Sequence, residues 1–266
     1  MLNPKLKLNS KIFNADVEQI PTRKGFGLGL LSAGEQDKNI VGLCADLTES
    51  TQMNLFADRF PERFIQTGIA EQNLVTTASG LSAMGKIPFC SSYAIFSPGR
   101  NWEQIRTTIA YNDRKVVIVG SHAGVSVGAD GGSHQALEDI ALMRVMPNMD
   151  VFSPCDSIEA EKATLALSKT KVLNLASVKP VDKDAILNLA KETKALVTVE
   201  EHQVSGGMGS LISEIVAENF PVPIEFIGVH DKFGQSGTPE ELFKYYGLDK
   251  DSIKSAVKKV LRRKSS

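Results

Sequence analysis

The sequence has almost no excess of charge of either sign. Its 266 residues include 30 lysines and arginines against 31 aspartates and glutamates, a formal net charge of −1 at pH 7. Proteins that bind nucleic acid or a membrane surface over a wide area usually have a strong basic excess, so we expect neither as a main partner. The one basic segment, residues 254–264, is expected to be a solvated helix end, where cations are favoured.

Cysteine is scarce and long apolar runs are absent. The three cysteines, Cys44, Cys90 and Cys155, lie far apart and form no CxxC pair, which is typical of reduced, buried thiols in a cytoplasmic protein. No segment approaches the ~20 apolar residues of a membrane span, and the first residues lack the apolar stretch of a signal peptide. No set of His, Cys, Asp and Glu has the spacing of metal ligands, so no metal site within this chain is expected.

Short apolar runs alternate with amphipathic segments along most of the chain. This alternation predicts βαβ units, and therefore an α/β fold with a parallel sheet flanked by helices. The predicted strands are residues 39–44, 63–67, 87–91, 115–120, 149–152, 171–175, 195–199 and 224–229. The predicted helices are residues 22–35, 70–84, 99–111, 135–143, 157–167, 182–191 and 206–219, with two more near 240 and 251.

The rhythm of strands and helices restarts near residue 170, which predicts two domains, residues 1–170 and 171–266. The second domain has only about three clear strands, whereas a typical sheet has ~5–6. We therefore expect the second sheet to be short of a strand or two.

Glu71 follows a predicted strand and a short turn, in the sequence Gly68-Ile69-Ala70-Glu71-Gln72. A carboxylate in the first turn of a helix interacts favourably with the free amide groups there, so an ordinary helix-start glutamate is one interpretation. The small residues before it indicate close packing, and ligands of open α/β sheets bind at the carboxyl ends of strands. Glu71 is therefore also a candidate ligand-binding residue.

Aromatic residues cluster just after the third predicted strand. Phe89, Tyr93 and Phe96, with Trp102 further on, could form a wall for a planar ring. Such clusters belong to the core more often than to a cofactor site. However, Ser91-Ser92 and the Ser97-Pro98-Gly99 segment interrupt the apolar pattern, which a plain core strand would not need.

A glycine-rich loop, Gly128-Ala129-Asp130-Gly131-Gly132-Ser133-His134, precedes a predicted helix at residue 135. Glycine allows positive φ angles and close approach of a ligand, although a simple turn capped by Ser133 is the alternative. His122 lies upstream at a strand end, so it and His134 are expected to face one crevice, where histidine can move protons near neutral pH. His202 and His230 are expected to be structural.

A second glycine-rich segment, Ser205-Gly206-Gly207-Met208-Gly209, resembles a phosphate-binding loop in composition only. It lacks the lysine of a P-loop and the full dinucleotide pattern. We expect instead a helix start that packs tightly against a neighbouring subunit.

Three motifs in this order resemble the transketolase family. They are Asp46-Leu47-Thr48, Gly68-Ile69-Ala70-Glu71-Gln72, and His122 followed by residues 128–135. The resemblance covers the pyrimidine-binding domain and continues into the C-terminal domain, from Val178-Lys179-Pro180 to residues 234–237. It implies a thiamine-diphosphate-binding fold, and a chain similar to the C-terminal subunit of a split transketolase, without the diphosphate-binding domain and its magnesium motif.

The resemblance assigns four residues to the cofactor, thiamine diphosphate. Glu71 matches the glutamate that hydrogen-bonds the aminopyrimidine ring and favours the imino tautomer, which removes the thiazolium proton. Tyr93 and Phe96 match aromatic residues that stack on the pyrimidine, and Asp46 matches an aspartate near the thiazolium. Magnesium or calcium is expected to be bound through the partner subunit.

The resemblance also assigns residues to the sugar substrates. Asp130 and His134 match residues that hold the sugar hydroxyls, and His134 is expected to assist proton transfer. Arg23, Ser50 and His122 match positions that bind the sugar phosphate, which suits their charge and hydrogen-bonding capacity. The implied catalytic residues are Glu71, Asp130 and His134.

The implied reaction is transfer of a two-carbon ketol unit between sugar phosphates, a step of the pentose phosphate pathway. It is expected to require an N-terminal, diphosphate-binding partner subunit in an α2β2 heterotetramer.

Two departures from the family pattern keep alternatives open. Ala129 stands where many transketolases have glutamate and is like 1-deoxyxylulose-5-phosphate synthase, although His122 weighs against that enzyme. Residues 165–173 join the two domains directly, where the family has a strand with a phosphate-binding arginine, a linker, and the first strand and helix of the C-terminal domain. The alternatives are such a synthase, the β subunit of a 2-oxoacid dehydrogenase, or a non-catalytic homologue; the intact Glu71, Asp130 and His134 argue against the last.

Overall fold

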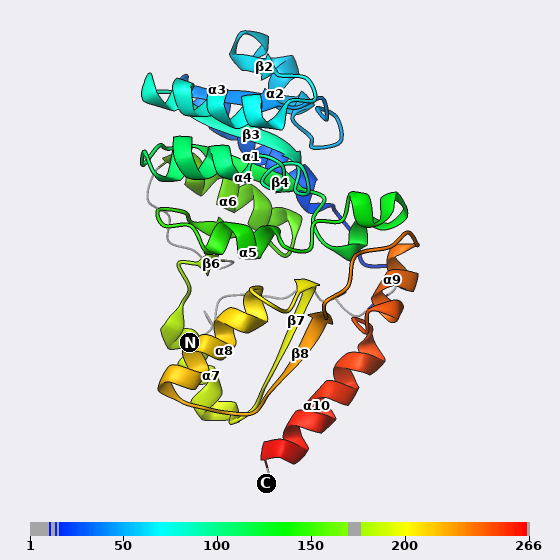
Figure 1. Ribbon diagram of the computed structural model, residues 1–266. Helices are drawn as coiled ribbons and strands as arrows, with labels where there is room; N and C mark the ends of the chain where they lie inside the picture. The colour runs from blue at the N-terminus through cyan, green and yellow to red at the C-terminus, as the bar shows by residue number, and fades with distance from the viewer. Residues whose placement is uncertain (1–10, 12–13, 15, 170–176, 265–266) are drawn as a thin grey trace.

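The computed structural model describes residues 11, 14, 16–169 and 177–264 (Figure 1). The upper part of the view in Figure 1 is a four-stranded sheet between helices, and the lower part is a smaller two-stranded sheet with its own helices. Among the described residues, no helix is long and apolar enough to cross a membrane.

The four-stranded sheet is parallel throughout and has the order β2-β1-β3-β4. This confirms the α/β fold predicted from the alternating pattern. The strands lie within two residues of the predicted bounds. They are β1 (Ile40–Cys44), β2 (Phe64–Gln66), β3 (Ile87–Tyr93) and β4 (Val117–Ser121).

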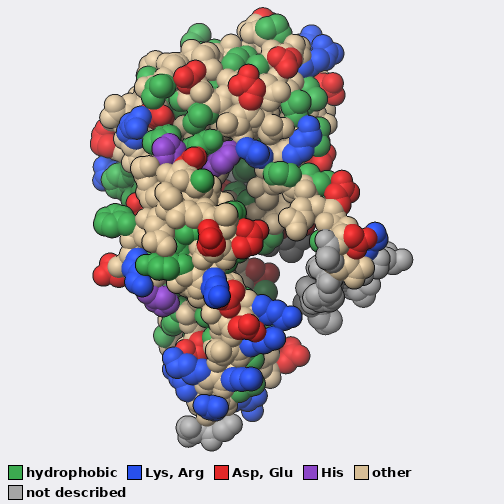
Figure 2. All heavy atoms as spheres, turned by 90° about the vertical axis from the view of Figure 1, so that its right-hand side faces the viewer, with side chains coloured by type: hydrophobic (Ala, Val, Ile, Leu, Met, Phe, Trp, Pro, Cys, Tyr) green, Lys and Arg blue, Asp and Glu red, His purple; other side chains and the backbone are tan. Residues whose placement is uncertain are grey.

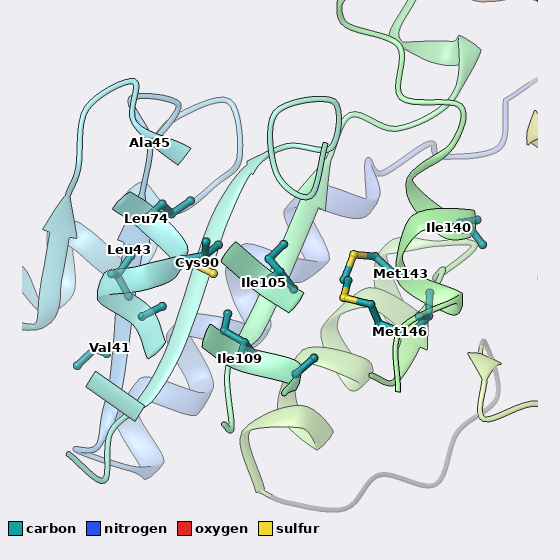
Figure 3. Close-up of a cluster of buried hydrophobic side chains, with 14 of the residues drawn as sticks. Val41, Leu43, Ala45, Leu74, Cys90, Ile105, Ile109, Ile140, Met143 and Met146 are labelled. Carbon is teal, nitrogen blue, oxygen red and sulfur yellow. The ribbon is translucent and has the colours of Figure 1, made fainter. Parts of the chain in front are cut away.

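Strand β1 is buried on both faces, as its continuous apolar run predicts. Because side chains alternate along a strand, Val41 and Leu43 join one hydrophobic cluster, whereas Ile40 and Cys44 join another on the opposite face. Figure 3 shows the first cluster, in which Val41 and Leu43 lie with side chains from the neighbouring helices. The sheet is therefore the middle layer of three.

Helices cover both faces of this sheet. On the face of the second cluster, α1 packs against α6 so closely that a Cβ atom at Gly25 would collide with the Ser157 carbonyl, and one at Gly29 would lie 2.8 Å from the Glu161 carbonyl oxygen. These glycines explain the small-residue composition of α1. The helices of this part are α1 (Thr22–Gln36), α2 (Asn54–Arg59), α3 (Glu71–Ala83), α4 (Trp102–Gln104), α5 (Asp139–Arg144) and α6 (Ser157–Lys169), with a π-helical turn η2 (Ile105–Ala110).

Two predicted helices differ from the observed ones. The helix predicted at residues 99–111 is a short α-helix continued by the π-turn η2. The helix predicted from residue 135 begins only at Asp139, because Ala136 forms a parallel bridge with Ala123 and its carbonyl accepts a hydrogen bond from Gly124. The backbone before Asp139 is thus held extended against the end of β4.

Strand β5 (Val151–Phe152) does not join the parallel sheet. It pairs antiparallel with β6 (Ser177–Lys179). Lys179 holds this arrangement, since its ammonium group donates hydrogen bonds to the carbonyls of Arg144, the last residue of α5, and of Met146 just past it. The prediction that residues 149–152 continue the βαβ series is therefore wrong, and the strand predicted at residues 171–175 lies outside the described residues.

The lower part contains a parallel pair, β7 (Leu196–Gln203) and β8 (Ile224–Val229). Where the structure is described, this sheet has two strands, because β6 pairs with β5 instead. The predicted helices are all present, and Thr238 and Glu241 form a capping box at the start of α9. They are α7 (Lys183–Thr193), α8 (Met208–Asn219), α9 (Pro239–Tyr245) and α10 (Lys250–Lys264).

Helix α10 confirms the expected solvated basic helix. Only Ala256 and Val260 are buried, and its lysines and arginines are exposed. Figure 2 shows Lys and Arg side chains gathered at this lower end of the molecule. Arg263 and Lys259 both pair with Glu225 of β8, so part of the basic face also fixes the helix to the sheet.

The cysteines are only partly as predicted. All three are free, and Cys44 and Cys90 are buried. Burial raises the pKa of the Cys90 thiol to about 12, which makes it unreactive. Cys155 is exposed, so the prediction of a buried thiol is wrong at that position.

Candidate active site

Glu71 is a buried carboxylate at the end of the sheet. It is the first residue of α3, reached from β2 through a turn in which Gly68 has a φ of +68°. Its exposed fraction is 2%, and the Arg100 guanidinium donates a hydrogen bond of 2.6 Å to its Oε2 atom. Buried charges are rare unless paired, so this position differs from that of an ordinary helix-start glutamate.

Asn101 fixes the backbone of the same residue. Its side chain is fully buried, and its amide nitrogen donates to the Glu71 carbonyl at 2.7 Å and to the Ser97 hydroxyl at 3.1 Å. The consecutive residues Arg100 and Asn101 therefore hold the carboxylate and the main chain of Glu71 together.

Tyr93 and Phe96 form the predicted aromatic wall. Their rings are nearly parallel, with centroids 6.3 Å apart and an interplanar angle of 6°. Phe89 does not belong to this wall, because it is fully buried in the cluster under α1. Trp102 packs against the opposite cluster and donates its indole N–H to the Leu142 carbonyl. The core interpretation is thus correct for Phe89 and Trp102.

His122 stacks on Tyr93, with a centroid distance of 4.0 Å. Arg23 donates to its Nε2 atom at 3.0 Å, so we assign the proton to Nδ1, which lies 2.8 Å from the Ser121 hydroxyl. Burial, reinforced by the Arg23 charge, lowers the pKa of His122 to about 4. The imidazole is therefore neutral at pH 7.

Ser50, the remaining residue predicted to bind the sugar phosphate, lies next to Arg23 and His122. Its carbonyl accepts a hydrogen bond of 3.2 Å from Arg23. Residues from α1, from the segment after β1 and from the end of β4 are thus brought together, although they are far apart in the sequence.

The glycine-rich loop is a series of 3-10 turns, η3 (Val125–Ser133), rather than a turn that enters a helix. Gly128 and Gly131 have φ angles of +81° and +70°, which explains glycine at these positions. Ser133 does not cap a helix; its hydroxyl lies 2.9 Å from Nδ1 of His134. The His134 ring places its edge against Phe96, at a centroid distance of 5.4 Å. Both site histidines therefore contact the aromatic wall.

The carboxylates Asp130 and Asp46 are both exposed. Asp130 is exposed in the glycine-rich loop, and its charge opposes the lowering of the His122 pKa, which indicates that the two side chains are near each other. Asp46 is exposed after β1 with a φ of +57°, and its amide donates to Gln66 at 2.7 Å.

Three residues that hold the parts of this candidate site in place were not predicted from the sequence. Arg100 and Asn101 were not singled out, although the need of a buried carboxylate for a cation could have prompted a search for one. Gln135 was quoted only as part of a motif. It is buried, and its amide nitrogen lies within 3.3 Å of the carbonyl oxygens of Val125, Gly128 and Gln235.

Through Gln135, the glycine-rich loop rests on the C-terminal part of the chain. A Cβ atom at Gly132 would lie 2.5 Å from the Gly234 carbonyl oxygen. The motif at residues 234–237, far from the sheet in sequence, therefore supports the loop that carries His134.

The other histidines and the second glycine-rich segment lie outside the site. His202 is buried and pairs with Asp139 at 3.1 Å, which is a structural role as predicted, and His230 is exposed on the C-terminal part. The start of α8 packs against its own chain: Glu200 accepts hydrogen bonds from the amides of Met208 and Gly209. The contact of this helix start with a neighbouring subunit stays a prediction.

Among the residues that the structure describes, no group of three His, Cys, Asp or Glu side chains could hold a metal ion.

Comparison of the sequence with known protein families gives two matches. Residues 18–175 match the pyrimidine binding domain of transketolase, and residues 158–253 match the transketolase C-terminal domain. The chain belongs to the transketolase family. Transketolases depend on thiamine diphosphate.

Several relatives are themselves separate subunits. A protein of Methanocaldococcus jannaschii described as a putative transketolase C-terminal section is 36% identical, with coverage of 91% of this chain and 96% of the relative. A 6-deoxy-6-sulfo-D-fructose transketolase subunit of a Clostridium species is 32% identical, with coverage of 89% and 93%. The first alignment runs over 307 positions although this chain has 266 residues, so the relative contains stretches that face gaps here.

A solved structure gives the same result. A split gene transketolase, described as an inactive beta4 tetramer, is 36% identical and superposes with a TM-score of 0.83, with coverage of 92% of this chain and 99% of the other. The resemblance to the C-terminal subunit of a split transketolase is thereby confirmed.

Proposed function

We propose that this chain acts in thiamine-diphosphate-dependent transfer of a two-carbon ketol unit between sugar phosphates, together with a diphosphate-binding N-terminal subunit. The observation that most supports this is the buried Glu71 carboxylate beside the parallel rings of Tyr93 and Phe96. An aminopyrimidine is flat and carries ring nitrogens, so it needs stacking surfaces and a hydrogen-bond partner at its edge.

The donor set of the site suits such a ring. Glu71 is the residue that would accept a hydrogen bond from a ring N–H and so favour the form of the ring that carries this proton. The family role of Tyr93 and Phe96 is stacking, and both are partly buried at the end of β3 or just after it. Asp46 would lie near the thiazolium. When bound, thiamine diphosphate supplies the carbon that carries the two-carbon unit.

The sugar phosphate would be held at the opposite side of the aromatic wall. Arg23 supplies positive charge, and the Nε2 atom of His122 would release its contact with Arg23 to interact with a phosphate. Ser50 belongs to the same group through Arg23. A dianion beside His122 favours the protonated imidazole, so phosphate binding is expected to raise its pKa.

His134 and Asp130 complete the substrate side. Both residues belong to the glycine-rich loop, and the hydroxyl of Ser133 restricts the orientation of the His134 ring. We assign them to the sugar hydroxyls, with His134 moving a proton during carbon–carbon bond cleavage.

Assembly with a partner is supported by relatives that are themselves separate subunits. The proposed partner carries the diphosphate- and metal-binding domain, in a cytoplasmic α2β2 assembly that serves the pentose phosphate pathway. The similar split gene transketolase is an inactive beta4 tetramer, which supports self-association and loss of activity without a second subunit. Within the chain, the proposed domains are residues 1–170 and 171–266.

The test is ketol transfer from xylulose 5-phosphate to ribose 5-phosphate with thiamine diphosphate and magnesium. Activity is expected only when this chain is mixed with the N-terminal transketolase subunit of its source organism, and Glu71→Ala should abolish it. Activity with pyruvate as the donor would instead indicate a deoxyxylulose synthase. No activity in a mixture that forms a complex would indicate a non-catalytic homologue.

A further inference from the structure

We infer that Arg100 is a positioning residue that holds Glu71 by one carboxylate oxygen and leaves the other oxygen for the cofactor ring. This inference deepens the proposed function and rests on it. It names a residue that the family motifs do not include, and it predicts effects on ligand affinity that a purely structural ion pair would not have.

The carboxylate is bound on one side only. Arg100 contacts Oε2 of Glu71 at 2.6 Å, and no other described residue forms a hydrogen bond with this carboxylate. A carboxylate can accept about four hydrogen bonds, so a buried one that accepts a single bond retains capacity for a further donor. The ring N–H of an aminopyrimidine is a donor of the required kind.

Arg100 also belongs to the wall on which the ring would stack. Its guanidinium carbon lies 4.8 Å from the centroid of the Phe96 ring, within the range of a cation–π contact. The arginine thus sets the orientation of the acceptor relative to a stacking surface. Its side chain is 47% exposed, so it reaches Glu71 from the solvent side rather than from the core.

The main chain is restrained independently. Asn101 holds the Glu71 carbonyl, and Ser97 in turn holds the Asn101 side chain. Because these contacts do not involve the carboxylate, loss of the Arg100 side chain should free the Glu71 side chain without unfolding the start of α3. Mutation can therefore separate the contact that Arg100 makes with the Glu71 carboxylate from the contact that Asn101 makes with the Glu71 main chain.

The first experiment measures thermal unfolding of the chain alone. The variants are Arg100→Met, Glu71→Gln and the double variant, with Arg106→Met as a matched control on an exposed arginine nearby. Arg100→Met should lower the melting temperature by several degrees, because it leaves a buried charge unpaired, and Glu71→Gln should restore most of that loss. Emission from Trp102, the one tryptophan in the sequence, checks that the local fold is kept.

The second experiment measures the thiamine diphosphate affinity of the complex with the N-terminal subunit, by calorimetry in the presence of magnesium. Arg100→Met should weaken binding about 10- to 100-fold, and Arg106→Met should not. Arg100→Lys should recover part of the affinity, since it keeps the charge but loses the planar fork.

The outcomes separate the inference from the proposed function. Unchanged cofactor affinity in folded Arg100→Met, or additive effects of Arg100→Met and Glu71→Gln on the melting temperature, would overturn the role of Arg100. If the wild-type complex does not bind thiamine diphosphate, the proposed function fails, while non-additive melting temperatures would still support the pairing of Arg100 with Glu71.

Discussion

Glu71 and Glu200 are two buried glutamates that lie beside helix starts, and they are bound in opposite ways. Glu71 is the first residue of α3, and one exposed arginine holds one of its oxygens. Glu200 comes from β7, and both of its oxygens accept backbone amides at the start of α8, at 2.7 and 2.9 Å. Burial raises the pKa of Glu200, and the two amides oppose that shift.

The difference separates a carboxylate that is fixed by the main chain from one that a side chain holds on one oxygen. Main-chain amides cannot move aside without changes in the fold, so both oxygens of Glu200 are fixed to the start of α8. A side chain on a partly exposed residue can reorient, and it leaves Glu71 with capacity for a further bond. The histidines of the two regions also differ. His122, in the region of Glu71, is neutral and lies beside the positive charge of Arg23, whereas His202, close to Glu200 in the sequence, lies beside the negative charge of Asp139.

The largest expected effect is on catalysis. Glu71→Gln should lower ketol transfer by roughly 10²- to 10⁴-fold, since it replaces the charged acceptor of the ring N–H by a neutral amide, while stability changes by less than ~1 kcal/mol. Glu200→Gln should leave the rate per folded complex nearly unchanged. Steady-state rates of both variants, normalised to the folded fraction, make the comparison. Equal losses of rate in the two variants would remove the distinction.

The next effect is on stability. Glu200→Ala should lower the free energy of unfolding by about 2 kcal/mol, because the amides of Met208 and Gly209 lose their acceptors in a buried position. Urea unfolding followed by circular dichroism measures this. A variant as stable as the wild type would show that water replaces the carboxylate, and that Glu200 does not fix α8.

The smallest effect is in the pH dependence. The pKa of His122 is lowered in the folded chain, so its contribution to stability is present above about pH 6.5 and is lost as the pH falls towards about 4, by about 1–2 kcal/mol after solvent screening. The pKa of His202 is raised: burial opposes the charge, but Asp139, Glu201 and Glu200 outweigh it. Its contribution is present below about pH 6.5 and is lost as the pH rises through the folded pKa.

Urea unfolding at pH 5 and pH 8 tests these signs. For each variant, the loss is the decrease in the free energy of unfolding relative to the wild type. This loss should be smaller at pH 5 than at pH 8 for His122→Gln, and smaller at pH 8 than at pH 5 for His202→Gln. The same direction of change in both variants would contradict the contrast between the two histidine environments.

Local sequence patterns were sufficient to predict most of the strands and helices. The apolar run of β1 predicts burial on both faces, and the strand–turn–helix order places Glu71 at the end of the sheet. The family resemblance brought Arg23 and His122 into one group, and the structure joins them at 3.0 Å.

Contacts between distant segments could not be predicted in this way. The bond between Arg100 and Glu71 spans 29 residues, and the pairing of β5 with β6 joins strands that helix α6 separates in the sequence. Propensity also favoured a helix from residue 135, but a bridge to Ala123 keeps that segment extended. In each case the tertiary environment overrides a local preference.

The close approach of Gly132 to Gly234 has a consequence for protein engineering. The loop that carries His134 takes its shape from a segment about a hundred residues downstream, and Gln135 bonds to the Gln235 carbonyl there. The C-terminal part is therefore not an exchangeable module. A chimera that takes this part from a relative would have to take residues 128–135 from the same parent, or His134 would rest on a mismatched support.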